Sequence, residues 1–253
     1  TLETIDDTFI VTGQNLTWKI DKNTGLIRSA QIEHITVLTE GPILTITPLT
    51  ATRKQIKDRD IKPLNAAFDS FKADSVNAYQ RDENVILQLA GNYPKAQGFY
   101  TIKFDPNANA EIGYRFEMKE EINPREVGLT FQLPRECDTL TWDRNPLYST
   151  YPDTHIARPL GIAKAIPDPN LLNSKPSTPP NVPWYLDTTP MGSNDFRSTK
   201  YNIFSAALTN PDGAGVKVIS DAQASTRSYI EDNSIKLLVA GYSNAGFDPF
   251  FRK

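Results

Sequence analysis

Apolar and polar residues alternate along many short stretches of this chain. In Glu111–Met118 the alternation is complete and predicts a strand with one buried face. Its inward side chains are expected to be Ile112, Tyr114, Phe116 and Met118. The stretch Asn15–Ile20 follows the same rule, with Trp18 on the apolar face. The turn Asp21–Gly25 then leads into a returning stretch, which predicts a β-hairpin with Gly25 suited to positive φ.

The same pattern recurs from one end of the chain to the other. Besides the returning strand at 26–32, further strands are predicted at 9–12, 43–49, 85–89, 98–104, 126–133, 201–208, 215–219 and 235–240. Many short strands joined by turns favour stacked antiparallel sheets over βαβ units. The expected fold is therefore all-β, a single large antiparallel β-sandwich domain over residues 1–253. One short helix is expected near Leu64–Phe71.

The segment 142–197 interrupts the pattern. Its recurring prolines argue against regular structure, so 146–190 is predicted to be a long proline-rich loop. The segment also gathers aromatic rings and forked polar groups, which suit a sugar because a sugar has apolar C–H faces and a rim of hydroxyls. The candidate carbohydrate-binding residues are Trp142, Tyr151, Asp153, His155, Arg158, Trp184, Asp195 and Arg197.

Each of these candidates also has a structural interpretation. A tryptophan such as Trp184 can stack on a sugar or staple a loop, and the arginines can bind hydroxyls or pair with nearby aspartates. Asp153 and Asp195 can hold loop backbone through its N–H groups. His155 suits acid–base chemistry because its ordinary pKa is about 6.5, but it can equally hydrogen-bond the loop. The sequence leaves these alternatives open.

The composition of the chain limits the classes of partner and ligand that are expected. The net charge of −3 and pI near 5.5 come without a basic stripe, so no nucleic-acid partner is expected. No apolar run reaches about eighteen residues, so no membrane span is expected either. Cys137 is the only cysteine, so an intrachain disulfide is excluded. Its side chain is expected to pack as a small hydrophobic group. With two histidines and one cysteine, no zinc site is predicted, and no cofactor is expected.

Several short runs, taken in order, resemble the small-chain domain of family 2 β-galactosidases. The hairpin Asn15–Ile27, followed by Glu40–Leu44, is similar to the opening of that domain. Tyr151–Asp153 with Arg158 resembles its Tyr-Pro-Asp-Arg region, and Asn194–Arg197 resembles a short run that ends in arginine.

Two regions depart from the family pattern. Many members carry Arg-Ala-Pro-Thr-Asp-Asn-Asp where this chain has Arg53–Asp58. A Gly-Asp-Asp-Ser-Trp run is typical near the C-terminus, where this chain has Ala245–Phe251. The second departure removes a run that the family places close to its active site.

The resemblance implies the supersandwich fold shared with aldose mutarotases (galactose-mutarotase-like) and a multidomain parent glycosidase. In such enzymes the two catalytic carboxylates lie on a TIM barrel elsewhere in the polypeptide, so no catalytic residue is assigned here. The chain is then expected to be a non-catalytic C-terminal domain whose work is structural: packing on the barrel, shaping one wall of the sugar cleft, or supporting subunit contacts. Its partners would be the other domains of the same polypeptide, with a galactoside as candidate ligand, and family analogy suggests a periplasmic or secreted location.

Two other functions remain open at this point. One is an aldose epimerase (mutarotase)-like enzyme, with His155 as acid or base and Asp153, Asp195 or Glu231 as its partner. The other is an independent carbohydrate-binding module that uses Trp184.

Overall fold

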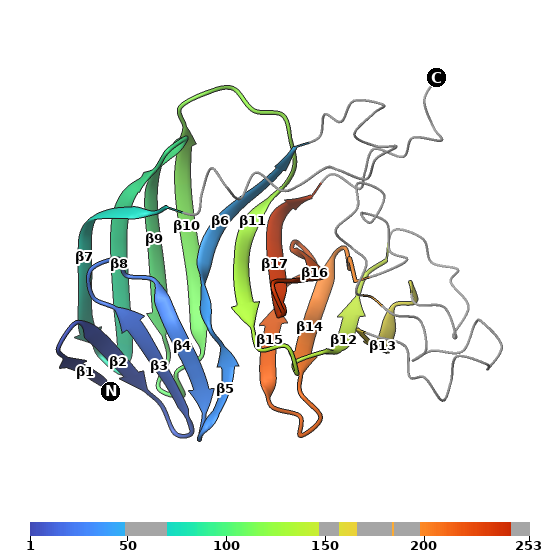
Figure 1. The fold of residues 1–253 in the computed structure, drawn as a ribbon, viewed down its shortest axis with the longest axis horizontal. Helices are drawn as coiled ribbons and strands as arrows, with labels where there is room; N and C mark the ends of the chain where they lie inside the picture. Colours follow the sequence, from blue (N-terminus) through green and yellow to red (C-terminus); the bar gives the residue numbers. More distant parts are fainter. Residues whose placement is uncertain (49–69, 147–156, 166–183, 185–197, 244–253) are drawn as a thin grey trace. The chain divides into compact units, whose positions relative to one another are not determined.

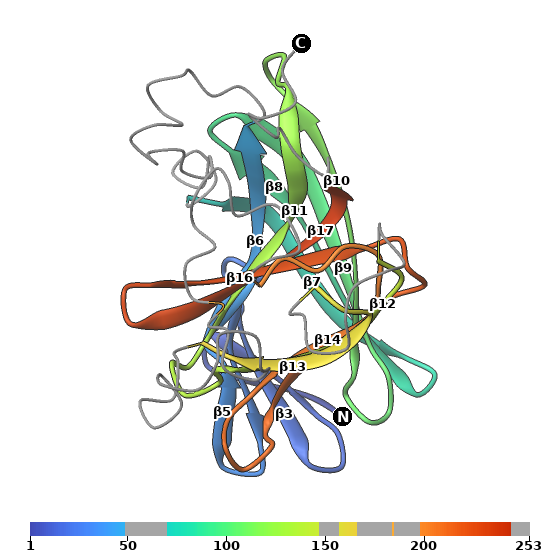
Figure 2. The same ribbon diagram turned by 90° about the vertical axis from the view of Figure 1, so that its right-hand side faces the viewer.

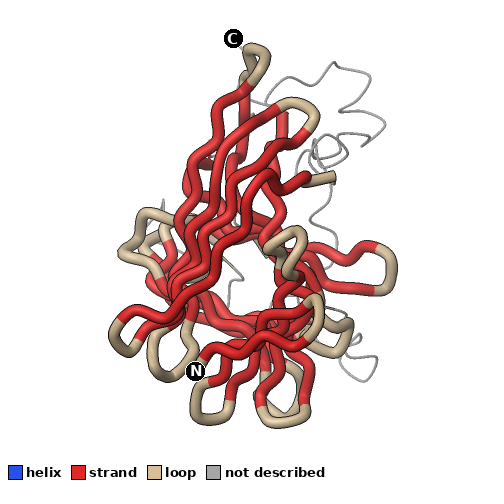
Figure 3. Tube along the Cα trace, turned by 90° about the vertical axis from the view of Figure 1, so that its left-hand side faces the viewer, coloured by secondary structure: helices blue, strands red, loops and turns tan. Residues whose placement is uncertain are grey.

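The computed structural model describes residues 1–48, 70–146, 157–165, 184 and 198–243. Among them all regular structure is β-strand, as the red trace in Figure 3 shows, and the strands pair antiparallel. This confirms the predicted all-β antiparallel fold. Since none of these residues is helical, none belongs to a helix that could cross a bilayer. The chain forms two compact units, unit 1 with residues 1–43 and 65–122, and unit 2 with residues 44–64 and 123–253.

Unit 1 contains two sets of strands. The first has the order β1-β2-β3-β4, with β5 and the start of β6 beside β4. The second is a four-stranded sheet in the order β10-β9-β8-β7 (Figure 1). The bounds of the first set are β1 Leu2–Ile5, β2 Thr8–Thr12, β3 Leu16–Asp21, β4 Ile27–Ile32, β5 Ile35–Leu38 and β6 Glu40–Pro48. Those of the second are β7 Lys72–Arg81, β8 Asn84–Tyr93, β9 Ala96–Phe104 and β10 Ala110–Met118.

The two sets pack face to face as a sandwich. Trp18 of β3 lies against Phe104 of β9 with ring centroids 5.4 Å apart, and its Nε1 donates to the carbonyl of Ala108 at 2.8 Å. Trp18 is therefore a core residue, as its place on the apolar face indicated.

An aromatic cluster fills the far end of the same core. The hydroxyls of Tyr93 and Tyr100 hydrogen-bond at 2.6 Å, and Phe71 and Phe116 pack on both rings. Phe116 thus points inward, as the alternation of Glu111–Met118 predicted, while the intervening side chains of that strand are exposed.

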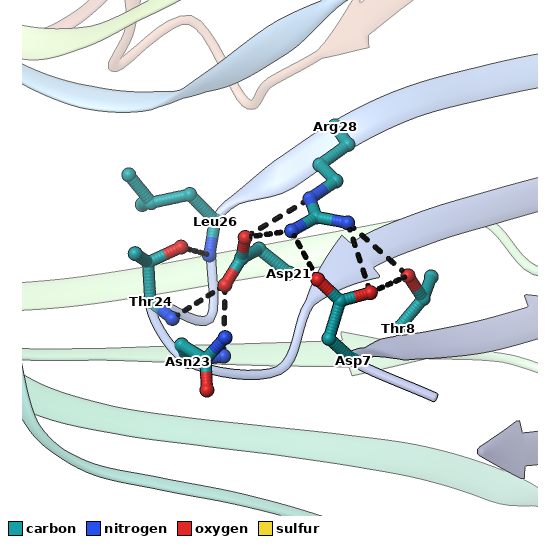
Figure 4. Close-up of polar contacts among 7 residues, drawn as sticks. All are labelled: Asp7, Thr8, Asp21, Asn23, Thr24, Leu26 and Arg28. Carbon is teal, nitrogen blue, oxygen red and sulfur yellow. Dashed lines mark hydrogen bonds and ion pairs between the residues drawn. The ribbon is translucent and has the colours of Figure 1, made fainter. Parts of the chain in front are cut away.

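The hairpin between β3 and β4 forms at the predicted turn (Figure 4). The carboxylate of Asp21 accepts hydrogen bonds from the backbone N–H groups of Asn23 and Thr24, both at 2.8 Å. Gly25 has φ of +72°, where a side chain would be strained. The sequence prediction for this turn is confirmed.

Arg28 ties this hairpin to the turn before β2 (Figure 4). Its guanidinium pairs with Asp21 and, at 3.0 Å, with Asp7. Hydrogen bonds from Arg28 and Thr8 lower the pKa of Asp7. For Asp21, burial acts to raise the pKa, but the turn amides and Arg28 outweigh it and the net pKa is lowered.

Unit 2 also contains two sets of strands. The first continues from the end of β6 in the order β6-β11-β17-β16. The second is a four-stranded sheet in the order β13-β12-β14-β15, of which β12, β13 and β14 are labelled in Figure 2. The bounds are β11 Pro124–Leu133, β12 Thr139–Arg144, β13 Leu160–Lys164, β14 Ile203–Thr209, β15 Gly215–Ile219, β16 Ser225–Glu231 and β17 Ser234–Ser243.

A buried ion pair crosses the first of these sheets. The guanidinium of Arg227 in β16 donates to both carboxylate oxygens of Glu126 in β11, at 3.0 and 2.7 Å, and to the hydroxyl of Thr47 in β6 at 3.3 Å. Burial by itself would raise the pKa of Glu126. The charges of Arg227 and Arg125 and the hydrogen bonds from Arg227 and Thr47 outweigh burial, so the net pKa of Glu126 is lowered.

Two parts of the segment predicted to be irregular are strands. Trp142 and Arg144 belong to β12, and Leu160–Lys164 forms β13 inside the predicted loop 146–190. The loop prediction is wrong there because β13 is held by pairing with β12, a long-range contact that local composition does not reveal. Most of the remaining loop, and all but the last two residues of the expected helix near Leu64–Phe71, lie outside the described residues.

Candidate functional site

Trp142 and Arg158, both predicted from sequence as candidate site residues, meet in unit 2. Trp142 lies in β12 with 2% of its surface exposed, and its Nε1 donates to the backbone carbonyl of Arg158 at 2.8 Å. Gly161 is its cross-strand partner in β13. A Cβ at Gly161 would lie 2.3 Å from the indole, so only glycine lets the ring lie over β13 this closely.

Two further cations surround this indole. The ammonium nitrogen of Lys200 lies 4.3 Å from the centroid of a Trp142 ring, and Lys200 is 0% exposed. Arg144, also buried, donates from Nε to the carbonyl of Arg158 at 3.4 Å and from a terminal nitrogen to the carbonyl of Ala157. We call Trp142, Arg144, Arg158 and Lys200 the Trp142 cluster. A desolvated cation over an aromatic face gains about 2 kcal/mol or more, so the ring contributes to the burial of Lys200.

The Trp142 cluster closes the base of one segment of the chain. The backbone N–H of Arg144 donates to the carbonyl of Pro159 at 3.0 Å, in addition to the side-chain bonds from Arg144 to Ala157 and Arg158. The two ends of the segment 145–156 are therefore fixed to each other.

Trp184 is buried at a separate position in unit 2. It is 0% exposed, and its Nε1 donates to the carbonyl of Asp138 at 3.0 Å. Its backbone N–H donates to the carbonyl of Lys164, at the end of β13, at 3.3 Å. Trp184 thus connects the residue before β12 to the end of β13. This favours its structural interpretation, in which the tryptophan holds a loop in place, over stacking on a sugar.

The other sequence-predicted residues are not placed. Tyr151, Asp153, His155, Asp195 and Arg197 lie outside the described residues. Lys200, by contrast, could not be predicted from the sequence, because a fully buried lysine is rare and no neighbouring residue marks it.

Cys137 is buried beside this region at 1% exposure. Burial and the nearby Glu136 and Asp138 carboxylates raise the pKa of its thiol to about 11. At pH 8 the thiol is therefore protonated, which suits packing and does not suit a nucleophile.

We expect Cys137 to resist Ellman's reagent at pH 8 in the folded protein and to react fully in 6 M guanidinium chloride, because the thiolate is the reacting species and burial excludes the reagent. The denatured sample supplies the control, since it counts the total thiol. Rapid reaction of the folded protein would show that the thiol is accessible.

Metal ligands do not gather in the part of the chain that the structure describes: no group of three or more His, Cys, Asp or Glu side chains is placed to hold an ion there. The described residues form an all-β sandwich, and unit 2 holds the Trp142 cluster, in which Trp142, Arg144 and Lys200 are buried. The chain belongs to the β-galactosidase small chain family, whose model matches residues 12–167, more than half of its length. No curated protein matches the chain at a significant level.

The family match runs from the end of β2 through β10 of unit 1 and continues through β13 of unit 2. It includes Trp142, Arg144 and Arg158, while Trp184 and Lys200 lie beyond it. Membership associates the chain with glycosidases.

Proposed function

We propose that this chain is the non-catalytic C-terminal domain of a β-galactosidase-like glycoside hydrolase, in which it packs on the catalytic barrel and shapes one wall of the sugar cleft. The observation that carries the proposal is membership of the β-galactosidase small chain family across residues 12–167. The family forms part of multidomain β-galactosidases. The chemistry of hydrolysis, which needs two facing carboxylates, is assigned to the barrel.

The Trp142 cluster supports a role in shaping the cleft. It fixes the two ends of the segment 145–156, which contains the candidates Tyr151, Asp153 and His155. Loops anchored on a rigid scaffold are the usual carriers of ligand contacts. The cluster would act as a positioning element, since Trp142, Arg144 and Lys200 are buried.

Activity assays test this proposal. The chain alone should not hydrolyse p-nitrophenyl β-D-galactoside above the buffer rate, and it should raise the activity of the separately produced barrel domain of the same polypeptide. Arg144→Gln should weaken that activation, because it removes the side-chain hydrogen bonds from Arg144 to the carbonyls of Ala157 and Arg158, whereas Arg28→Gln on the exposed network of unit 1 should not. Enzyme-like turnover by the chain alone would contradict the proposal.

The same samples discriminate the epimerase alternative. A polarimetric assay of galactose mutarotation compares the wild type with His155→Ala. Equal rates at the level of water would remove that alternative, and a faster wild type would favour it over the non-catalytic role.

A further inference from the structure

The outer face of the β7–β10 sheet carries a hollow of about 330 Å³. This volume is at the small end of the usual range for ligand pockets, roughly 300–1,000 Å³. The hollow lies on the face opposite the aromatic core, because Phe99 and Arg115 alternate with the inward Tyr100 and Phe116 along their strands. Its lining residues all belong to unit 1 and are Asp74, Ala90, Gly91, Asn92, Gln97, Gly98, Phe99, Arg115 and Glu117.

A small residue leaves room beside Phe99 on this face. Ala90 of β8 is the cross-strand partner of Phe99, whereas a Cβ at Gly91 or Gly98 would point to the core side, toward Phe71 and Phe116. A Cβ at Gly98 would lie 2.0 Å from the carbonyl oxygen of Arg115, so the backbones approach as closely as glycine allows. The neighbour of Phe99 on β8 is thus a single methyl group, which leaves its ring without a bulky cover on that side.

An aromatic surface forms one part of the hollow. Phe99 is 46% exposed, which gives it a free apolar area. On β10 its cross-strand partner is Arg115. A flat ring beside a guanidinium offers a stacking surface next to a fork of hydrogen-bond donors.

Polar side chains form the remaining lining. Gln97 has Asn92 as its partner on one side and Glu117 on the other, so two amides and a carboxylate lie in one row across the sheet. Asn92 donates to Asp74 at 2.6 Å, which orients both groups. Within the part of the chain that the structure describes, Gln97, Arg115 and Glu117 engage no side-chain partner, so their donors and acceptors are available to a ligand.

The charge of the lining selects the class of ligand. Two carboxylates and one guanidinium disfavour an anion, and the exposed ring favours apolar C–H groups. A ligand with a flat C–H face and a rim of hydroxyls matches both features, because hydroxyls bind amides, carboxylates and guanidinium groups alike. We propose that this hollow is a binding site for a neutral saccharide, with a pyranose ring stacked on Phe99 and its hydroxyls bonded to Gln97, Arg115 and Glu117.

This site differs from the region predicted from sequence, since its residues come from β7–β10 of unit 1 and the Trp142 cluster belongs to unit 2. The inference does not depend on the proposed function. A domain that supports a catalytic barrel and a domain that stands alone could each carry a saccharide site on an outer sheet face.

Titration of the full chain with lactose and cellobiose, followed by ¹H–¹⁵N NMR, tests the inference. The wild type should show saturable shifts, and Phe99→Ala should bind roughly tenfold more weakly because the stacking surface is removed. Phe204→Ala is the matched control, since Phe204 lies on β14 of unit 2 and is also 46% exposed. It should bind like the wild type.

Further variants keep the test decisive. Phe99→Tyr retains a ring and should retain binding, while Glu117→Gln and Gln97→Ala should each weaken it without altering the unfolding temperature. The absence of saturable shifts with either disaccharide would overturn the inference and leave the hollow to a protein partner. Equal loss of binding in Phe99→Ala and Phe204→Ala would also overturn it. The readout needs no catalysis, so loss of binding and failure to activate a barrel are separate results.

Discussion

Replacing Arg227 by methionine is expected to destabilise unit 2 by about 3–5 kcal/mol, because it leaves the carboxylate of Glu126 buried without its fork of donors. Arg227 and Glu126 have side-chain exposures of 5% and 2%, so water cannot solvate the remaining charge without disrupting the sheet. Urea unfolding followed by tryptophan fluorescence measures the loss, since Trp142 and Trp184 both lie in unit 2.

A double variant shows whether the loss of stability comes from the unpaired carboxylate of Glu126 or from the removal of Arg227 itself. Arg227→Met combined with Glu126→Leu should recover most of the stability, because well-packed apolar residues often replace a buried ion pair without loss. Arg28→Met, on the exposed network of unit 1, should leave the unfolding midpoint almost unchanged. If the single and double variants unfolded at the same urea concentration, the unpaired carboxylate would not be the cause.

The pH dependence of the Arg227 effect has a definite sign. The folded pKa of Glu126 lies below its ordinary value of 4.5, so the ion pair contributes fully above that value. Its contribution is lost as pH falls through the folded pKa. The difference in stability between the wild type and Arg227→Met should therefore narrow in acid, which urea unfolding at a series of pH values measures.

Trp142→Ala is expected to cost about 3–5 kcal/mol, the usual range for removing a buried tryptophan. The indole is 2% exposed, covers Gly161 and lies against the ammonium group of Lys200, so its removal opens a cavity beside a buried cation. Thermal unfolding followed by far-UV circular dichroism measures the loss. Trp142→Phe should cost less because it keeps an aromatic face, and Phe204→Ala should stay within about 0.5 kcal/mol of the wild type. A midpoint equal to that of the wild type in Trp142→Ala would show that the ring is not a structural support.

The strands that the sequence predicted are those with one apolar and one polar face. Glu111–Met118 and Asn15–Ile20 are examples, since a strand buried on one face alternates apolar and polar residues along the sequence. The strand β7, Lys72–Arg81, escaped prediction because it is an edge strand and is largely exposed on both faces. The strand β16, Ser225–Glu231, escaped for the opposite reason, since its buried residues include the polar Arg227 and Ser228.

The candidate site was predictable only in part. The sequence singled out Trp142 and Arg158, and the structure places them in contact, but their distance along the chain did not show that one would hydrogen-bond the other. Neither Lys200 nor the hollow at Phe99 left a local signal. Both depend on which strands become neighbours, and the local sequence does not predict which strands pair.

The bond between Arg227 and Thr47 joins residues 180 positions apart. At a ribosomal rate of about 5–20 residues per second, Arg227 emerges roughly 10–40 seconds after Thr47. Throughout that interval the Thr47 hydroxyl lacks this donor, although β11, the neighbour of β6 in the sheet, emerges before β16. A nascent chain stalled before β16 would present the edge of β11 to its neighbours, because the partner of β11 is β17, which follows β16 in the chain. Chaperone capture of such intermediates is the expected safeguard during biosynthesis.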